Sequence, residues 1–176
     1  TTVDSQGCVG EASSLAIGAD GLPIVAYYDI DYDNPTNLKV VRCGDAACAA
    51  GNQITTVDSQ DRVGYDPSLA IGADGLPIVA YLDDTHRTLK VVHCGDTACA
   101  GNQQITTVDA RGNCPSLAIS ADGLPIVAYY DYDNFDLKVV RCGDIACSGS
   151  NRLRAVDSQD LVGRSTSLAI GADGLP

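Results

Sequence analysis

One stretch of the chain, SLAIGADGLPIVAY from Ser14 to Tyr27, is repeated almost without change farther along the sequence. The same residues return from Ser68 to Tyr81, and again from Ser116 to Tyr129 with Ser120 in place of one glycine. A further copy begins at Ser167. Repetition of this kind is typical of proteins that stack copies of one supersecondary unit. The sequence therefore predicts a tandem array.

The period of the repeat follows from its equivalent leucines, which are Leu15, Leu69, Leu117 and Leu168. Their spacings are 54, 48 and 51 residues, and the variation falls in the loop after the tyrosine and in the stretch before the serine. The predicted units cover residues 1–54, 55–105 and 106–153, with a partial unit at 154–176. Three full units and a part cannot close a ring, so we expect a longer array or ends that are completed by neighbouring chains.

Each unit contains four short segments with the character of β-strands. SLAI and LPIVAY flank an Asp-Gly pair, which favours a hairpin with a type I′ turn. Leu38–Cys43 alternates between two faces, and Gln53–Asp58 is rich in β-branched residues. Four strands in about 50 residues is the size of a propeller blade. The predicted fold is all-β, with tandem four-stranded antiparallel blade-like units that form a β-propeller-like ring or an open, linear array.

The composition agrees with strands and tight turns and excludes two classes of partner. Glu11 is the only glutamate, so nearly all of the acid is aspartate, a turn-former. A net charge of −12 with 11 lysines and arginines leaves no basic stripe for a nucleic acid. No apolar run is long enough for a membrane span.

The repeated motifs resemble a tandem repeat of secreted bacterial and archaeal proteins. Its pattern is near S-x-A-x-D-x-x-G-x-P-x-x-x-Y-Y-D, then L-K, then T-V-D-S, and here Ser14–Asp29, Leu38-Lys39 and Thr56–Ser59 carry it. The resemblance covers the whole chain and implies a β-propeller-like fold without a particular chemistry. This chain differs from the pattern in its cysteines and in having no tryptophan.

Six of the eight cysteines form C-x4-C pairs, one after the third predicted strand of each unit. The pairs are Cys43 with Cys48, Cys94 with Cys99, and Cys142 with Cys147. We expect local disulfides and an oxidising, extracellular location, because zinc needs four ligands and each unit offers two sulfurs. Metal and redox roles are the alternatives. Cys8 and Cys114 are left over, to bridge units one and three or to link neighbouring chains.

An aspartate-rich loop follows the second predicted strand of the first unit. Asp29, Asp31 and Asp33 alternate along it, and Asp131 and Asp133 form a shorter version in the third unit. Calcium prefers six to eight oxygen ligands, so the first loop is a candidate Ca²⁺ site. The alternative is a solvated hairpin tip made of turn-forming residues.

The same strand end carries tyrosines that recur between units. Tyr28 and Tyr130 are expected to point away from the packed layer, where they could bind a sugar. The alternative is that the tyrosines only cap the core.

No catalytic set emerges, because there is one glutamate and both histidines, His86 and His93, fall in one unit. The chain is therefore predicted not to be an enzyme.

The favoured function is an extracellular structural or adhesive protein, a scaffold segment that forms filaments by self-association through its open repeat ends. The near identity of the units indicates that every unit does the same job. The alternative is a carbohydrate-binding, lectin-like propeller that uses the recurring tyrosines and aspartates, with a glycan as partner.

Overall fold

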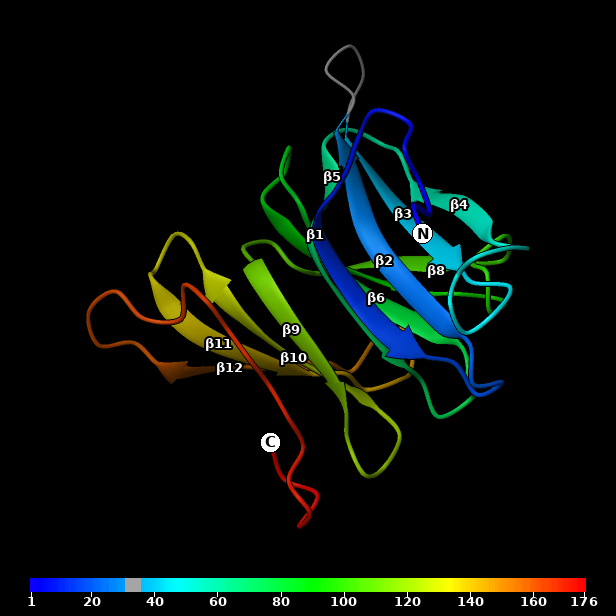
Figure 1. Cartoon of the computed structure of the whole chain (residues 1–176). Coiled ribbons are helices and arrows are strands. Elements are labelled where there is room, and N and C mark those ends of the chain that lie inside the picture. Colours follow the sequence, from blue (N-terminus) through cyan, green and yellow to red (C-terminus); the bar gives the residue numbers. More distant parts are fainter. Residues whose placement is uncertain (31–35) are drawn as a thin grey trace.

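The computed structural model describes residues 1–30 and 36–176 of the chain. Their regular structure is entirely β, in three antiparallel four-stranded sheets that follow one another along the chain (Figure 1). Blade one contains β1 (Cys8–Ile17), β2 (Pro23–Ile30), β3 (Asn37–Arg42) and β4 (Gln53–Asp58). Blade two contains β5 (Val63–Ile71), β6 (Pro77–Asp83), β7 (Thr88–His93) and β8 (Gln104–Asp109). Blade three contains β9 (Asn113–Ile119), β10 (Pro125–Asp131), β11 (Asp136–Arg141) and β12 (Arg152–Asp157).

The strands of each blade lie in chain order, so that every connection within a blade is a hairpin. The prediction of an all-β fold made of four-stranded antiparallel units is confirmed. The sheets span residues 8–58, 63–109 and 113–157, so each ends a few residues beyond the unit boundary expected from the sequence. In the described part of the chain, no helix could cross a membrane.

The turn between the first two strands differs from the expected type I′. In blade one, Gly21 donates to the carbonyl of Gly18 (2.9 Å), and Gly18 donates to that of Leu22 (2.8 Å). Only Gly21 has a positive φ, +79°, whereas type I′ requires two such residues. The turn is a four-residue turn closed by a left-handed glycine. The carboxylate of Asp20 stabilises the turn by accepting a hydrogen bond from the backbone N–H of Leu22 (3.0 Å).

Adjacent blades pack face to face, with the apolar core between them. One face of β2 and β3 contributes Ile24, Ala26, Leu38 and Val40 to the first core cluster. Blade two contributes residues from β5, β6, β7 and the disulfide loop after β7, namely Val63, Leu69, Val79, Tyr81, Val92, Cys94 and Cys99. A second cluster of equivalent residues joins blades two and three. Because side chains alternate along a strand, each blade uses one face toward the preceding blade and the other toward the next.

The first strands of successive blades contact one another and are linked by the same hydrogen bond. In each case the backbone N–H of the repeat leucine donates to the hydroxyl of the repeat serine in the preceding unit, at 2.9 Å. The pairs are Leu69 with Ser14, Leu117 with Ser68, and Leu168 with Ser116. The last pair shows that residues after β12 lie on blade three as a following unit would.

The three C-x4-C pairs are disulfides in the structure, as the sequence predicts. Each closes a tight loop after the third strand of its blade. In blade one the carboxylate of Asp45 accepts the N–H groups of Ala47, Ala49 and Ala50 and holds this loop. Three disulfides are typical of proteins in oxidising compartments.

The two remaining cysteines lie in the first strands of blades one and three. The inter-unit bridge considered for them is not formed, because Cys114 carries a free thiol that donates to Asp66 (3.5 Å). Burial, with the nearby charge of Asp66, raises the pKa of Cys114 to about 11. Cys8 lies exposed at the start of β1. A link between neighbouring chains through these residues stays a prediction.

Candidate functional site

A buried polar cluster joins blade two to blade one at the end of β4. The hydroxyl of Tyr81 donates to Asp58 (2.7 Å), and the ammonium group of Lys90 lies 3.4 Å from the same oxygen. Lys90 also pairs with Asp83 at 3.0 Å. The side chains of Asp58 and Asp83 are only 4% and 2% exposed. We call this set of tyrosine, lysine and two aspartates the junction cluster.

The sequence places these groups together through strand geometry. Tyr81 and Asp83 are two residues apart on β6 and so share a face, and Lys90 on β7 is the direct cross-strand partner of Tyr81. Asp58 ends β4, in the preceding blade. The cluster is therefore complete only when a blade packs against the segment that precedes it.

The same cluster occurs wherever one unit follows another. Between blades two and three it consists of Asp109, Tyr129, Asp131 and Lys138, with Tyr129 donating at 2.6 Å and Lys138 pairing with Asp131 at 2.6 Å. In front of blade one it consists of Asp4, Tyr27, Asp29 and Lys39, with Tyr27 donating to Asp4 at 2.8 Å. Each blade therefore docks onto what precedes it by the same chemistry.

Burial and pairing act on the ionisable groups of the cluster in opposite directions. Burial alone would raise the pKa of Asp83, but the hydrogen bonds from Lys90 and His86 outweigh it and hold the pKa below its usual value. The same balance lowers the pKa of Asp131 to about 2. Burial would lower the pKa of Lys90, and its two aspartates raise it instead. Pairing thus favours the charged forms of Asp83 and Lys90, which lie 3.0 Å apart.

The junction tyrosines predict how the protein responds to alkali. Burial, followed by the neighbouring aspartate, raises the pKa of Tyr27, Tyr81 and Tyr129 well above the usual value. Tyrosines of the unfolded chain ionise at about pH 10, so unfolding releases protons above that pH. The free energy of unfolding therefore falls as the pH rises. We expect the tyrosinate absorbance of these buried tyrosines and the circular dichroism to follow one cooperative alkaline transition. Titration of all eight tyrosines while the dichroism stays unchanged would contradict this.

The candidate calcium loop shares a residue with the junction cluster in front of blade one. Asp29 pairs with Lys39 at 2.8 Å, whereas Asp31 and Asp33 lie outside the described residues. In the shorter loop of blade three, Asp131 accepts the N–H groups of Asp133 and Asn134. There the aspartate closes its own loop by hydrogen bonds. Calcium binding by Asp29, Asp31 and Asp33 stays a prediction, which a calorimetric titration tests.

The two tyrosines expected to face outward are buried in the structure. Tyr28 stacks on Tyr65 of blade two, with ring centroids 4.9 Å apart, and Tyr130 packs beside Tyr132 and Phe135. Tyr28 is covered because the face of blade one that carries it packs on blade two, whereas Tyr130 is covered by side chains of its own hairpin loop. Ligand binding by Tyr28 and Tyr130 stays a prediction. The exposed aromatic side chains of this loop in blade three are Tyr132 and Phe135, which the sequence did not distinguish from the others.

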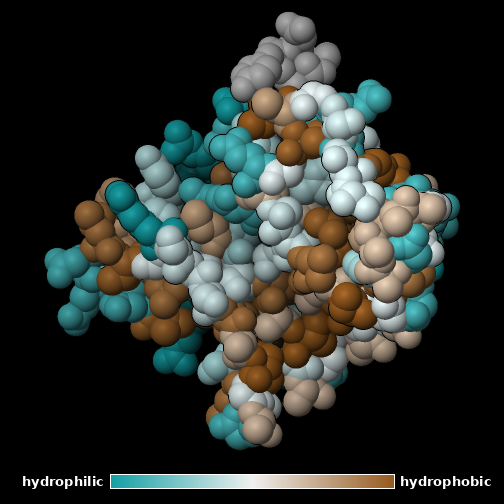
Figure 2. Space-filling model, viewed as in Figure 1, coloured by the Kyte–Doolittle hydropathy of each residue, from teal (hydrophilic) through white to brown (hydrophobic). Residues whose placement is uncertain are grey.

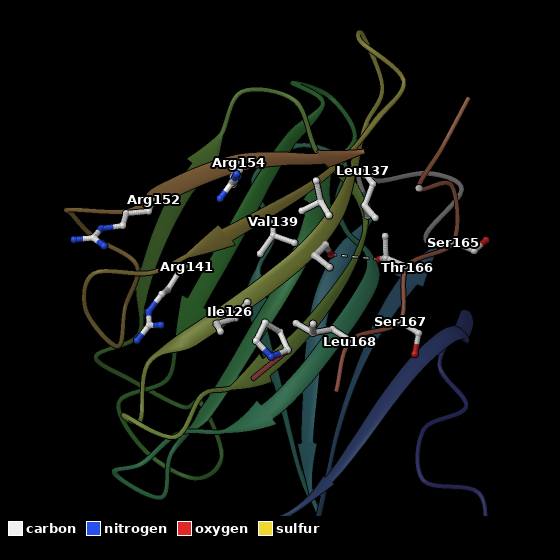
Figure 3. Close-up of a pocket in the computed structure, with 14 residues that line it drawn as sticks. Ile126, Leu137, Val139, Arg141, Arg152, Arg154, Ser165, Thr166, Ser167 and Leu168 are labelled. Carbon is white, nitrogen blue, oxygen red and sulfur yellow. Dashed lines mark hydrogen bonds between the residues drawn. The ribbon is translucent and has the colours of Figure 1, made fainter. Parts of the chain in front are cut away.

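Blade three has an open groove on the face that corresponds to the packed faces of blades one and two (Figure 3). Its volume is about 790 Å³. Ile126, Leu137 and Val139 line its floor, and three arginines from β11 and β12 stand on one side, with residues 165–168 on the other. On the opposite end of the molecule, Figure 2 shows apolar surface over β1, where Leu15 and Ile17 are exposed.

Comparison with known proteins identifies relatives in structure only. No protein-family model and no curated protein matches the sequence. A protein of unknown function from Dyadobacter fermentans is similar in structure, with a TM-score of 0.65 and 11% identity over 82% of this chain and 41% of that one. A thermostable family-43 glycoside hydrolase gives a TM-score of 0.59 at 12% identity, over 93% of this chain and 62% of that one.

An α-L-arabinofuranosidase from Clostridium thermocellum is also similar, with a TM-score of 0.51 and 10% identity over 87% of this chain and 54% of that one. The fold is of the β-propeller type. The chain spans less than two thirds of the length of each of these structures. At such identities the likeness concerns the fold, and the activities of those proteins are not carried over to this propeller-type chain.

Proposed function

We propose that this chain is an extracellular structural scaffold without enzymatic activity, in which blades of one kind are added through one repeated junction. The observation that supports it is the junction cluster, which has the same composition at every place where one unit follows another. Its carboxylates are tied to lysines within the packed interface, which leaves them poorly placed for catalysis. The disulfides suit a structure that has to persist outside the cell.

The two outer faces of the molecule are complementary halves of this junction. Val57 of blade one is buried against blade two, but its counterpart Val156 in blade three is 59% exposed. Leu69 of blade two is buried against blade one, but its counterpart Leu15 in blade one is 60% exposed. A second copy can therefore dock its blade one onto blade three of the first. Residues 164–171 of the accepting copy correspond to residues 11–18 of the incoming one, and residues 1–6 of the incoming copy correspond to residues 154–159 of the accepting one, so each segment would be replaced by its counterpart.

Sedimentation velocity over a range of concentrations tests this proposal. We expect species larger than one chain that grow with concentration and appear as filaments in electron micrographs. Val156→Asp and Leu15→Asp should each prevent growth, because each places a charge on one half of the junction. Leu161→Asp is the matched control, since Leu161 is similarly exposed, at 61%, but does not line the groove.

A mixture of the two blocked variants distinguishes head-to-tail docking from unspecific aggregation. Each variant retains the half of the junction that the other has lost, so the mixture should form two-chain species and nothing longer. Monomers at all concentrations, or equal effects of all three substitutions, would refute self-association through these faces.

A further inference from the structure

A small polar pocket opens between blades two and three, apart from the junction cluster. Its volume is about 220 Å³. Blade two and the loop after β6 contribute Leu82, Asp84 and Arg87, and blade three contributes Gly112, Asn113 and Tyr132. The pocket lies where the loops between second and third strands meet the start of the next blade.

The pocket exists because two positions that carry large side chains between blades one and two carry smaller ones between blades two and three. Tyr65 pairs with Leu82 in blade two, and Asn113 pairs with Tyr130 in blade three, so Tyr65 and Asn113 hold equivalent positions. By the same registers, Tyr28 of blade one corresponds to Leu82 of blade two. Between blades one and two, Tyr28 and Tyr65 stack and fill this place. Leucine and asparagine in their stead leave it open.

The walls of the pocket combine an aromatic ring with hydrogen-bond donors and a hydrogen-bond acceptor. Tyr132 is 46% exposed, and the guanidinium carbon of Arg87 lies 4.8 Å from its ring centroid. Among the described residues, this guanidinium makes no ion pair. The carbonyl oxygen of the Asn113 side chain accepts the N–H of Cys114 (2.8 Å), which leaves its amide hydrogens for a ligand. The carboxylate of Asp84 lies 3.3 Å from Arg62 and is partly exposed.

We propose that this pocket binds one sugar ring at the end of a glycan. A sugar offers C–H groups to an aromatic ring and adjacent hydroxyls that donate and accept hydrogen bonds at once. Tyr132 and Leu82 supply the apolar contact, Asp84 accepts, and Asn113 and Arg87 donate. The volume is below that of pockets for drug-sized ligands, which fits a single ring. The pocket also breaks the repetition that governs the rest of the molecule, as a specific site should.

The first junction supplies the variant that tests this inference. In the double variant L82Y/N113Y the tyrosine pair of blades one and two is recreated, which fills the pocket with side chains the fold already accepts. We expect the wild-type chain to bind sugars on a glycan array, and the double variant to bind at least about tenfold more weakly, a loss of about 1.4 kcal/mol. Its urea unfolding midpoint should stay close to that of the wild type.

A second pair of variants tests the aromatic contact. Tyr132→Ala should lose binding, whereas Phe135→Ala, a change in the same loop at a side chain that does not line the pocket, should retain it. Calorimetric titration with a neutral hexose and with a uronic acid shows whether Arg87 receives a carboxylate, and binding of either supports the site. Absence of binding by the wild type, or binding that L82Y/N113Y leaves unchanged, would overturn it. The sedimentation result is independent of this outcome.

Discussion

Replacing Asp58 by alanine is expected to lower the free energy of unfolding by about 3–5 kcal/mol, the usual cost of removing one partner from a buried ion pair. The change leaves the hydroxyl of Tyr81 buried without its acceptor, 2.7 Å away in the wild type, and leaves Lys90 with Asp83 alone. Urea unfolding followed by circular dichroism measures the loss. Tyr81→Phe should cost less, because it removes the donor and leaves Asp58 with Lys90.

The chain contains a matched control for this experiment. Asp157 holds the same place at the end of β12, is exposed, and accepts the N–H of Gln159 just as Asp58 accepts that of Gln60. Asp157→Ala therefore removes the same local hydrogen bond without a junction and should cost much less. Equal losses for both substitutions would show that the junction cluster contributes little to stability.

The second large effect is expected at a glycine that touches the preceding blade. A Cβ added to Gly64 would lie 2.7 Å from the Cα of Leu38, too close for any side chain. Gly64 also has a φ of +90°, which disfavours alanine. Gly64→Ala should therefore combine backbone strain of about 1–2 kcal/mol with overpacking of about 1–3 kcal/mol.

Gly10 separates these two contributions. It is the equivalent residue of blade one, with a φ of +79°, but a Cβ there would meet nothing within 4 Å. Gly10→Ala carries the strain alone, so the difference in unfolding midpoint between the two variants measures the contact between blades. A Gly64→Ala protein as stable as Gly10→Ala would mean that adjacent blades separate easily.

The strands could be predicted from the sequence because their signals are local. Alternation and β-branched residues placed Gln53–Asp58 with its observed bounds, and the repeat gave the number of strands in a unit. The hairpin was predicted at the right place with the wrong turn, because Asp-Gly suits more than one turn type. Asp20 does not adopt the positive φ that a type I′ turn requires. Its carboxylate instead accepts a hydrogen bond from the backbone N–H of Leu22.

The sites were harder to predict because they form between units. Alternation correctly separated Tyr27 from Tyr28, but it could not show that the outward side of one blade faces the inward side of the next. The signal for the junction cluster was present in the motifs A-Y, L-K and V-D, which place a tyrosine, a lysine and an aspartate at the same positions of every blade. Which of these polar residues meet depends on how whole sheets stack, and that is not a local property.

The division of each junction cluster between two units bears on how such a gene can change in length. Ser14–Tyr27 and Ser68–Tyr81 are identical in amino-acid sequence, so an exchange out of register between the stretches that encode them leaves the protein sequence at the exchange point unchanged. A crossover between them deletes or duplicates one whole period, and the aspartate that precedes the exchange still meets the tyrosine and lysine that follow it. Loss of a fraction of a period would instead separate donors from acceptors. Arrays of this design can therefore lengthen or shorten in whole blades without any compensating substitution.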